Sequence, residues 1–195
     1  MMAEQNKIAD PGPLGLAGFG LTTCILSLIN AGILSAEAMG VVLALAVAYG
    51  GGAQVLAGMW EFKKGNTFGA TAFTSFGAFW LSYYFIVKAE PGAGVAWFLL
   101  FFGILTLCLW IGSFYINKAL FLLFLTLTVT FFLLAIGDFG VAGFGVMGGW
   151  VGLLTGLIAL YTSAAGVIND TAGKIVLPVG DPLKTAAVTA KKLSA

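Results

Sequence analysis

Long apolar stretches, separated by short polar breaks, dominate the pattern of the chain. A helix that crosses a membrane needs roughly 20 mostly apolar residues. The stretches that meet this length are 13–34, 38–60, 67–88, 94–116, 118–138 and 144–168. The pattern therefore predicts an all-α membrane protein with six transmembrane helices in 13–168, a polar segment at 1–12 and a polar tail at 169–195. We expect the tail from Asp181 onward to be a flexible extension without a role.

The composition agrees with a membrane protein and removes several kinds of chemistry. Hydrophobic residues make up 60% of the 195 positions and charged residues only 9%, whereas soluble domains carry about 25% charged residues. The chain has no histidine and no arginine, which excludes imidazole metal ligands, histidine proton switches and bidentate arginine clamps. A formal net charge of +1 gives no electrostatic case for a nucleic-acid partner. We expect no metal and no cofactor.

The lysines predict how the chain sits in the membrane. Lys88 alone falls on one side of the predicted helices, and all the others fall on the opposite side: Lys7, Lys63, Lys64, Lys118, Lys174, Lys184, Lys191 and Lys192. By the positive-inside rule, both termini are cytoplasmic. We therefore expect an integral, multi-pass protein of the plasma membrane, with 1–12 and 169–195 in the cytoplasm.

Enzymatic chemistry finds no support in the predicted helices. They contain no ionisable pair, no Ser–His arrangement and no acid cluster, so we expect a protein that is not an enzyme. The sequence GFGVMG at 143–148 fits the glycine pattern of a dinucleotide site, but it precedes a predicted membrane helix and follows no strand. Cys24 and Cys108 lie in apolar stretches, and we expect both to be buried as small hydrophobic side chains.

Uncharged polar residues at membrane depth are the first candidates for function. A stripe at helical spacing runs along the third stretch and contains Thr67, Thr71, Thr74, Ser75 and Ser82. We interpret the stripe as the wall of a water-accessible path, although each hydroxyl can instead bond to its own helix carbonyls. Gln54 lies well inside the second stretch and Thr22 and Thr23 inside the first. For Gln54, a role in joining helices and a role in lining a pore remain equally open.

Small residues repeat every four positions in two of the stretches. Gly148, Gly152 and Gly156 do so in the last stretch, and Ala44, Ala48 and Gly52 do so in the second. Small residues at this spacing let helix backbones approach closely in lipid. We therefore expect close helix packing along both rows.

The first stretch begins with helix breakers. It reads DPGPLGLAGFGLTT at 10–23, with Pro13 and Gly15 among its prolines and glycines. We interpret this composition as a way to expose a helix N-terminus, whose free N–H groups and partial positive charge attract a small anion. The alternative is that Pro13 starts the helix and the glycines allow tight packing.

Two further places complete the candidates. Phe19 and Phe76 each lie among glycine and hydroxyl residues, where a ring can form a hydrophobic constriction. Glu61 follows the second stretch, and we expect it either to pair with a neighbouring lysine, Lys63 or Lys64, or to exchange a proton at the path. Asn66 and Thr67 then provide a capping pair for the next helix.

Four segments together resemble the acetate uptake transporter family. DPGPLGLAGFGLTT is similar to its N-P-A-P-L-G-L signature, with Asp10 in place of the usual Asn and Gly12 in place of the usual Ala. EFKKGNTFGATAFTSFGAFW, LTVTFFLLAIGD and GWVGLL also resemble family segments, and they occur in the same order over about 10–180. The resemblance therefore covers nearly the whole chain.

The resemblance implies a function and a set of residues. It implies six-helix protomers in a homo-oligomer, expected to be a hexamer, that transport acetate, with succinate as a further candidate. The mechanism is either an anion channel or symport with protons. The family constriction falls on Phe19, Phe76 and Leu127, where Phe76 replaces a Tyr. Together with the candidates above, the expected substrate-binding residues are Pro13, Gly15, Thr22, Thr23, Gln54, Glu61, Asn66, Thr67, Thr71, Thr74, Ala159 and Tyr161.

Two other functions remain open. One is a channel for a small neutral solute such as urea or an amide, because six-helix channels of that kind share the apolar, uncharged pattern. The other is a scaffold or sensor that transports nothing, which the lack of any sizeable polar region in the sequence disfavours.

Overall fold

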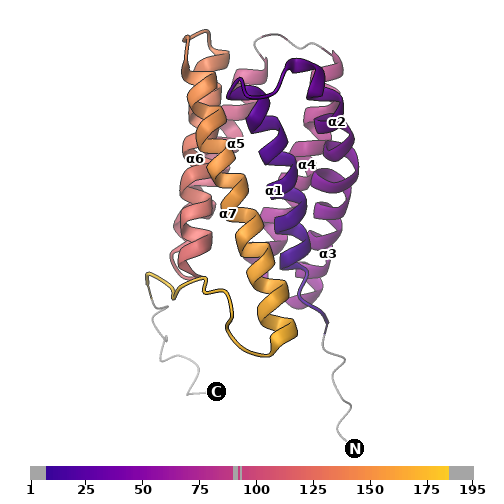
Figure 1. The fold of residues 1–195 in the computed structure, drawn as a ribbon, viewed down its shortest axis with the longest axis vertical. Helices are drawn as coiled ribbons and strands as arrows, with labels where there is room; N and C mark the ends of the chain where they lie inside the picture. Colours follow the sequence, from indigo (N-terminus) through magenta and orange to yellow (C-terminus); the bar gives the residue numbers. More distant parts are fainter. Residues whose placement is uncertain (1–7, 90–91, 93, 185–195) are drawn as a thin grey trace, which may run out of the picture.

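A computed structural model describes residues 8–89, 92 and 94–184. The described residues form helices and short connecting segments, with no strand among them, and the helices make one upright bundle (Figure 1). The elements in chain order are α1 (Gly12–Asn30), η1 (Ala36–Ala38), α2 (Met39–Val47), η2 (Ala48–Ala53), α3 (Gln54–Lys64), α4 (Thr67–Ala89), α5 (Gly94–Ser113), α6 (Lys118–Asp138) and α7 (Phe144–Ala172).

The six predicted membrane helices are confirmed as six helices long and apolar enough to cross a membrane. The first ends at Asn30, four residues earlier than predicted, and the second is one broken rod that runs from Ala36 to Lys64. The start of α1 and the end of α7 lie at the same end of the bundle, the lower end in Figure 1. The chain is therefore an integral, multi-pass membrane protein.

Glycines of α7 pack this helix closely against its neighbours. A Cβ on Gly156 would lie 2.9 Å from the carbonyl oxygen of Gly20 in α1, and one on Gly148 would lie 2.7 Å from Leu134 in α6. Both distances are too short for a side chain, so the prediction of close packing along α7 is confirmed. The second row does not pack inside the bundle at Ala44 and Ala48, which are exposed on the outside of the single chain.

The break in the second span also depends on glycine. The sequence AYGGGA at 48–53 forms a π-helical turn, η2, and Gly50 and Gly51 within it are buried. A Cβ on Gly18 of α1 would lie 2.7 Å from the carbonyl oxygen of Tyr49 in this turn. The turn therefore lets α1 and the second span touch backbone to backbone in the interior of the bundle.

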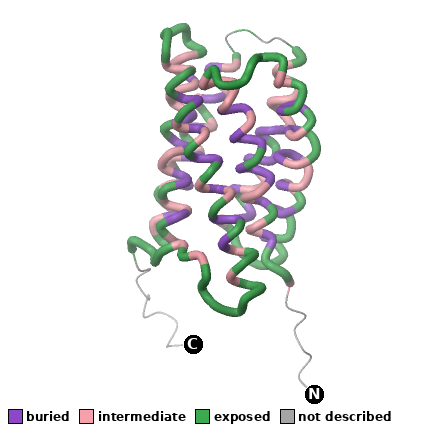
Figure 2. The backbone as a smooth tube through the Cα atoms, viewed as in Figure 1, coloured by how far each residue is buried: buried purple, intermediate pink, exposed green. Residues whose placement is uncertain are grey.

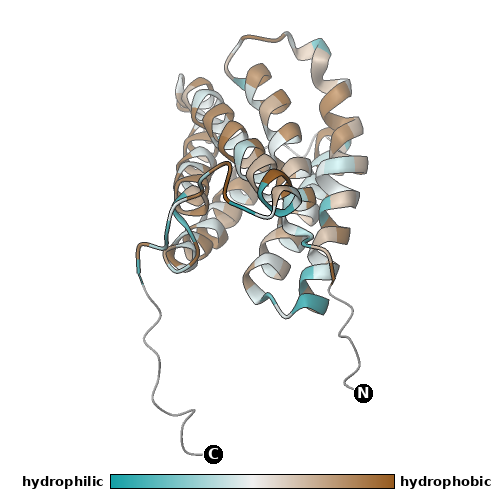
Figure 3. Ribbon diagram, turned by 60° about the horizontal axis from the view of Figure 1, so that its bottom comes forward, coloured by the Kyte–Doolittle hydropathy of each residue, from teal (hydrophilic) through white to brown (hydrophobic). Residues whose placement is uncertain are grey.

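The outside of the bundle is apolar, as expected of a surface that meets lipid. Figure 2 shows buried positions concentrated on the inner faces of the helices, and Figure 3 shows hydrophilic residues mainly near helix ends and connecting segments. Large apolar side chains such as Phe85 and Phe101 are exposed on this surface. Cys24 is buried as predicted, but Cys108 is exposed because its position on α5 faces outward, so that part of the cysteine prediction is wrong.

Candidate solute pathway

Two cavities lie at opposite ends of the bundle interior. The first, which we call the N-side vestibule, lies at the end where α1 begins and has a volume of about 420 Å³. The second, the far-side vestibule, lies at the other end and has a volume of about 150 Å³. Residues from α1, α4 and α6 line both cavities. The two cavities therefore follow the same inner helix faces from opposite ends.

Aromatic side chains separate the two vestibules. Phe76 is only 3% exposed and lines neither cavity. Its ring centre lies 5.6 Å from that of Phe19 and 6.3 Å from that of Phe131, both of which line the far-side vestibule. It also lies 6.3 Å from the ring centre of Phe124, which lines the N-side vestibule. Phe76 is therefore the centre of an aromatic plug between the two cavities.

The structure brings the three predicted constriction residues together. Phe19, Phe76 and Leu127 are each 3–4% exposed and belong to one buried apolar cluster. Phe19 and Leu127 both line the far-side vestibule next to Phe131. The sequence singled out Phe19 and Phe76 but not Phe124 or Phe131, because nothing in the sequence distinguishes these two from most of the 17 phenylalanines of the chain.

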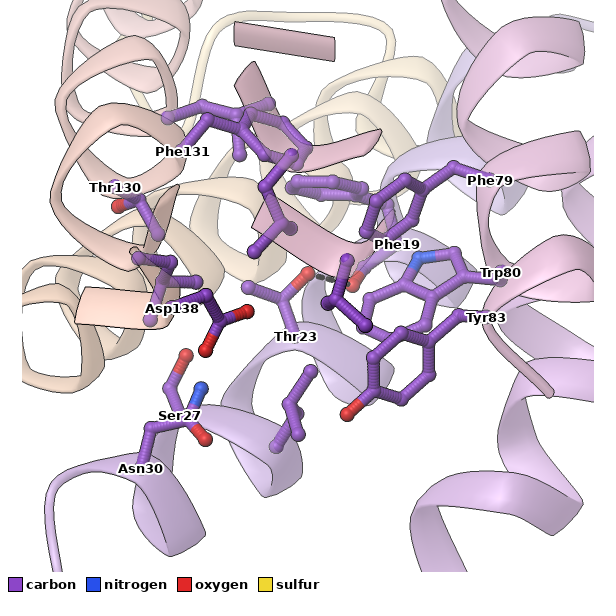
Figure 4. A pocket seen from close by; sticks show the side chains of 15 residues that line it. Phe19, Thr23, Ser27, Asn30, Phe79, Trp80, Tyr83, Thr130, Phe131 and Asp138 are labelled. Atoms are coloured by element: carbon purple, nitrogen blue, oxygen red, sulfur yellow. Dashed lines mark hydrogen bonds between the residues drawn. The ribbon is translucent and has the colours of Figure 1, made fainter. Parts of the chain in front are cut away.

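The far-side vestibule carries polar groups at its outer part (Figure 4). The side chains of Ser27, Asn30, Tyr83 and Asp138 line it, and Figure 4 shows them pointing into the same cavity. Thr23 also lines the cavity, and its hydroxyl donates a hydrogen bond of 2.7 Å to the carbonyl oxygen of Phe19. Asp138 ends α6 and is not among the predicted site residues. In the sequence, an acidic residue at the end of an apolar stretch indicates only the polar break between two spans.

The N-side vestibule contains an ion pair at the start of α1. Lys64 Nζ lies 2.9 Å from Asp10 Oδ1, and the backbone N–H of Gly12 donates to the same oxygen at 2.9 Å. Partial burial raises the pKa of the Asp10 carboxyl, but the hydrogen bonds from Lys64 and Gly12 and the charge of Lys64 outweigh it, so this pKa is lowered from its ordinary value. The Asp10 side chain is therefore a carboxylate at neutral pH.

This ion pair corrects two predictions. The first turn of α1 is not an open anion site, because Asp10 already accepts from Gly12 and because Pro11 and Pro13 have no N–H to offer. Glu61 does not pair with a lysine, since Lys64 pairs with Asp10 instead. The N-terminus of α1, which we predicted to attract an anion, is thus occupied by the carboxylate of Asp10.

Glu61 is held in place by the start of α4. Its side chain is 1% exposed and lines the N-side vestibule, and its Oε2 accepts a hydrogen bond of 2.9 Å from Asn66 Nδ2. The Asn66 Oδ1 accepts from the backbone N–H of Gly69 at 3.2 Å, which caps α4 as predicted. Glu61, Asn66 and Pro13 are the predicted binding residues that line this vestibule, joined by Asp10 and Lys64.

The hydroxyl stripe of α4 does not line a path. Thr67 and Thr71 are exposed on the outside of the chain, and the vestibules are lined by the opposite face of α4 through Phe68, Ala72 and Phe79. Thr74 packs against α3, since a Cβ on Gly58 would collide with its hydroxyl. The prediction of a water-accessible stripe is therefore wrong, because helical spacing groups residues on one face but does not say which face is inside.

Other predicted residues are buried in helix packing instead. The hydroxyl of Thr22 donates to the carbonyl oxygen of Gly18, and a Cβ on Gly15 would lie 2.6 Å from the ring of Phe73. Ala159 is fully buried against Gly20, so it does not line either vestibule. The alternative interpretation, in which the glycines of α1 allow tight packing, is the one that the structure supports.

Gln54 is fully buried, but it does not line the path, and its side-chain oxygen does not join helices by a hydrogen bond to any described residue. It is 1% exposed, and it lines neither vestibule. Its Oε1 has no hydrogen-bond partner among the described residues. The side chain therefore lies in the packed region beside η2, not on the path defined by the cavities.

The segment after α7, residues 173–184, crosses the lower end of the bundle in Figure 1, and we call it the strap. Asn169 fixes it by accepting from the backbone N–H groups of Val176 and Leu177 and by donating to the carbonyl oxygen of Leu177. The strap then bonds to the start of α6, where Ala119 N–H donates to the carbonyl oxygen of Val179 at 2.9 Å. Val179 and Asn169 both line the N-side vestibule.

The strap corrects two more predictions. Tyr161 does not line a vestibule, because its hydroxyl donates to the carbonyl oxygen of Pro178 and so holds the strap. The predicted flexible extension is wrong at its start, since the N–H groups of Leu183 and Lys184 both donate to the carbonyl oxygen of Phe114. The rest of that extension, 185–195, lies outside the described residues.

The fold and the two vestibules define a class of protein. The chain is a multi-pass membrane protein whose bundle holds two cavities separated by buried aromatic side chains, the architecture of a channel or transporter for small solutes. The sequence then gives the family: the chain belongs to the GPR1/FUN34/yaaH family, whose model matches residues 1–182.

Three relatives place the chain within this family. It is 42% identical to the succinate-acetate/proton symporter SatP of Escherichia coli over 186 residues, which cover 91% of this chain and 98% of the relative. It is 38% identical to acetate permease A of Emericella nidulans, covering 90% of this chain and 67% of the relative. It is also 38% identical to ammonia transport outward protein 2 of Saccharomyces cerevisiae, covering 85% of this chain and 64% of the relative.

A solved structure has the same fold. The structure of the bacterial acetate channel SatP superposes with a TM-score of 0.86 at 43% identity, covering 89% of this chain and all of that chain. The resemblance noted in the sequence is therefore confirmed.

Proposed function

We propose that the chain transports acetate through each protomer, from one vestibule to the other past Phe76. The observation that carries this proposal is the aromatic plug, since the two cavities of one bundle are separated by the buried ring of Phe76 and the rings packed around it. Relatives named as an acetate permease and a succinate-acetate/proton symporter support acetate as the substrate. Succinate is the second candidate on the same ground.

The charges around the plug favour passage together with a proton. The N-side vestibule is lined by two carboxylates, Asp10 and Glu61, and by Lys64, which already pairs with Asp10. Asp138 adds a carboxylate to the far side. An isolated carboxylate in a dry, apolar passage is strongly disfavoured, whereas a neutral acid is not. We therefore propose symport of acetate and a proton in preference to an anion channel.

Acetate uptake into proteoliposomes tests the proposed function. Purified protein should take up radiolabelled acetate faster than empty vesicles do, and an inwardly directed proton gradient should increase the uptake. Uptake equal to that of empty vesicles, with and without a pH gradient, would reject transport of acetate.

A channel for a small neutral solute is the second candidate. Two observations favour it: the plug is apolar, and a relative at 38% identity is named as an ammonia transport protein. Stopped-flow swelling of the same vesicles in urea, an amide or ammonia distinguishes the two candidates. Swelling without acetate uptake would favour the neutral solute.

The placement of the protein in the cell is part of the proposal. We propose a plasma-membrane protein with both termini in the cytoplasm, because Lys63, Lys64, Lys118 and Lys174 lie at the end of the bundle where α1 begins and α7 ends. The named relatives are transporters or a channel, which supports a function other than catalysis. Thr171→Cys should react only with a reagent on the cytoplasmic side, and reaction from the other side would contradict this orientation.

We also propose a homo-oligomer, expected to be a hexamer. Exposed small residues on the outside of the second span, Ala44 and Ala48, offer a surface where a second copy can approach closely. Mass photometry in nanodiscs should give the mass of six chains, and the mass of one chain would contradict the assembly.

A further inference from the structure

Lys64 is the only cation among the described residues that line the two vestibules, and the protein supplies a carboxylate to occupy it. The N-side vestibule is lined by Lys64, and no lysine lines the far-side vestibule. Lys64 Nζ lies 2.9 Å from Asp10 Oδ1. The side chain of Asp10 is a methylene carrying a carboxylate, so it presents to Lys64 the same group that acetate would present.

Three charged groups converge on the first turn of α1. A Cβ on Gly12 would lie 3.1 Å from Asp10 Oδ1 and 3.6 Å from Glu61 Oε1. Glu61 is buried and bonded to Asn66, whereas the Lys64 ammonium, 37% exposed, forms its ion pair with Asp10. Removal of the Asp10 charge would therefore leave Lys64 without its ion-pair partner at the edge of the vestibule.

We propose that Asp10 is an affinity-determining residue, an internal counter-ion that keeps Lys64 from holding a permeating carboxylate. This inference rests on the proposed passage of acetate. A conduit must bind its solute weakly enough to release it. A free ammonium in the vestibule would bind a carboxylate more tightly, and the pair with Asp10 prevents that.

Substitution of Asp10 by Asn removes the negative charge of the side chain while nearly keeping its size and shape. Asn retains an oxygen that can accept the Gly12 N–H, so the start of α1 keeps its hydrogen bond. One unit of charge at about 4 Å in a water-filled space changes a binding constant about fivefold. We expect Asp10→Asn to lower the Kd for acetate about fivefold and Lys64→Gln to raise it about fivefold.

The double variant and a neighbouring lysine provide the controls. Asp10→Asn combined with Lys64→Gln restores the charge balance, so its Kd should return to that of the unaltered protein. Lys63 is exposed and lines neither vestibule, so Lys63→Gln should leave the Kd unchanged. All effects should shrink as salt rises, because counter-ions screen exposed charges.

Acetate titration by saturation-transfer NMR on the full chain in nanodiscs measures these Kd values without flux. A Kd for Asp10→Asn equal to or above that of the unaltered protein would overturn the proposal. If this variant does not fold, an unchanged Kd for Lys64→Gln would overturn it as well. Acetate flux distinguishes the proposed transport from the proposed role of Asp10. If the Kd values follow the expected order but the protein moves no acetate, transport alone is rejected. If the protein takes up acetate but the variants leave the Kd unaltered, only the role of Asp10 is rejected.

Discussion

At the scale of single residues, the properties of the plug follow from ring size. Phe19 is 4% exposed, its ring contacts that of Phe76, and it faces the far-side vestibule. A side chain in this position sets the width of the passage without offering any polar group. Selection among small acids should therefore depend on the volume of Phe19.

Substitution of Phe19 by Ala should widen the passage and admit larger acids. We expect the ratio of lactate flux to acetate flux to rise at least severalfold, because lactate is larger than acetate by one carbon and a hydroxyl group, which the narrow plug excludes. Radiolabelled fluxes into proteoliposomes measure this ratio. Phe85→Ala, on the exposed outer face of α4, is the matched control.

Loss of a buried ring also costs stability, about 3–5 kcal/mol in a packed core. Phe19→Leu is the milder variant and should give a smaller change in the same direction. If Phe19→Ala elutes as a folded protein and its flux ratio equals that of the unaltered chain, Phe19 does not lie at the narrowest point.

At the scale of elements, the strap connects α7 to the turn between α5 and α6. Asn169 makes three hydrogen bonds to residues 176 and 177. A hydrogen bond of this kind contributes about 1 kcal/mol net. Asn169 therefore contributes more hydrogen bonds to the strap than any other side chain among the described residues does.

Substitution of Asn169 by Ala should release the strap. We expect amide hydrogen exchange at residues 176–184 to become at least tenfold faster, while exchange in α1 stays the same. Mass spectrometry of peptides measures this, and Thr171→Ala, an exposed position on the same helix, is the control. Unchanged exchange at 176–184 would show that Tyr161 and the turn hold the strap without Asn169.

The elements also show how far the sequence alone could lead. Six spans and the glycine row of α7 were predictable, because length and spacing are properties of one segment. The orientation of α4 was not: its stripe of Thr67 and Thr71 faces outward, and the apolar face through Phe76 lines the interior. In a membrane helix the more polar face need not be inside, since threonine bonds to its own backbone.

Contacts between distant positions explain the remaining errors. The pair of Asp10 and Lys64 joins residues 54 positions apart, and the strap contacts Phe114 and Ala119, which lie far earlier in the chain. Hydropathy along the chain carries no information about such pairs. The carboxylate just before α1 and the lysine at the end of α3 are partners because the fold brings both helix ends to the N-side vestibule.

At the scale of the whole molecule, the account predicts electroneutral transport. Acetate and one proton that cross the plug together carry no net charge. We therefore expect acetate flux to be independent of membrane potential. Potassium gradients with valinomycin set the potential in proteoliposomes, and flux that follows the applied potential would indicate passage of the anion alone.

The central claim is that one path connects the two vestibules through Phe76. The most direct test introduces one cysteine at a time into a chain in which Cys24 and Cys108 have been replaced. The two variants are Ser27→Cys in the far-side vestibule and Ala72→Cys in the N-side vestibule. Thr171→Cys, exposed at the end of α7, is the control.

A small, negatively charged thiol reagent is applied to each variant, labelling is counted by mass spectrometry, and acetate flux is measured. We predict that each vestibule cysteine reacts from one side of the membrane only, with opposite sides for the two positions. Each modification should lower acetate flux at least fivefold, whereas modification of the control leaves it unchanged. Flux that survives complete labelling at both vestibule positions, or no labelling at either, would contradict a path through the protomer.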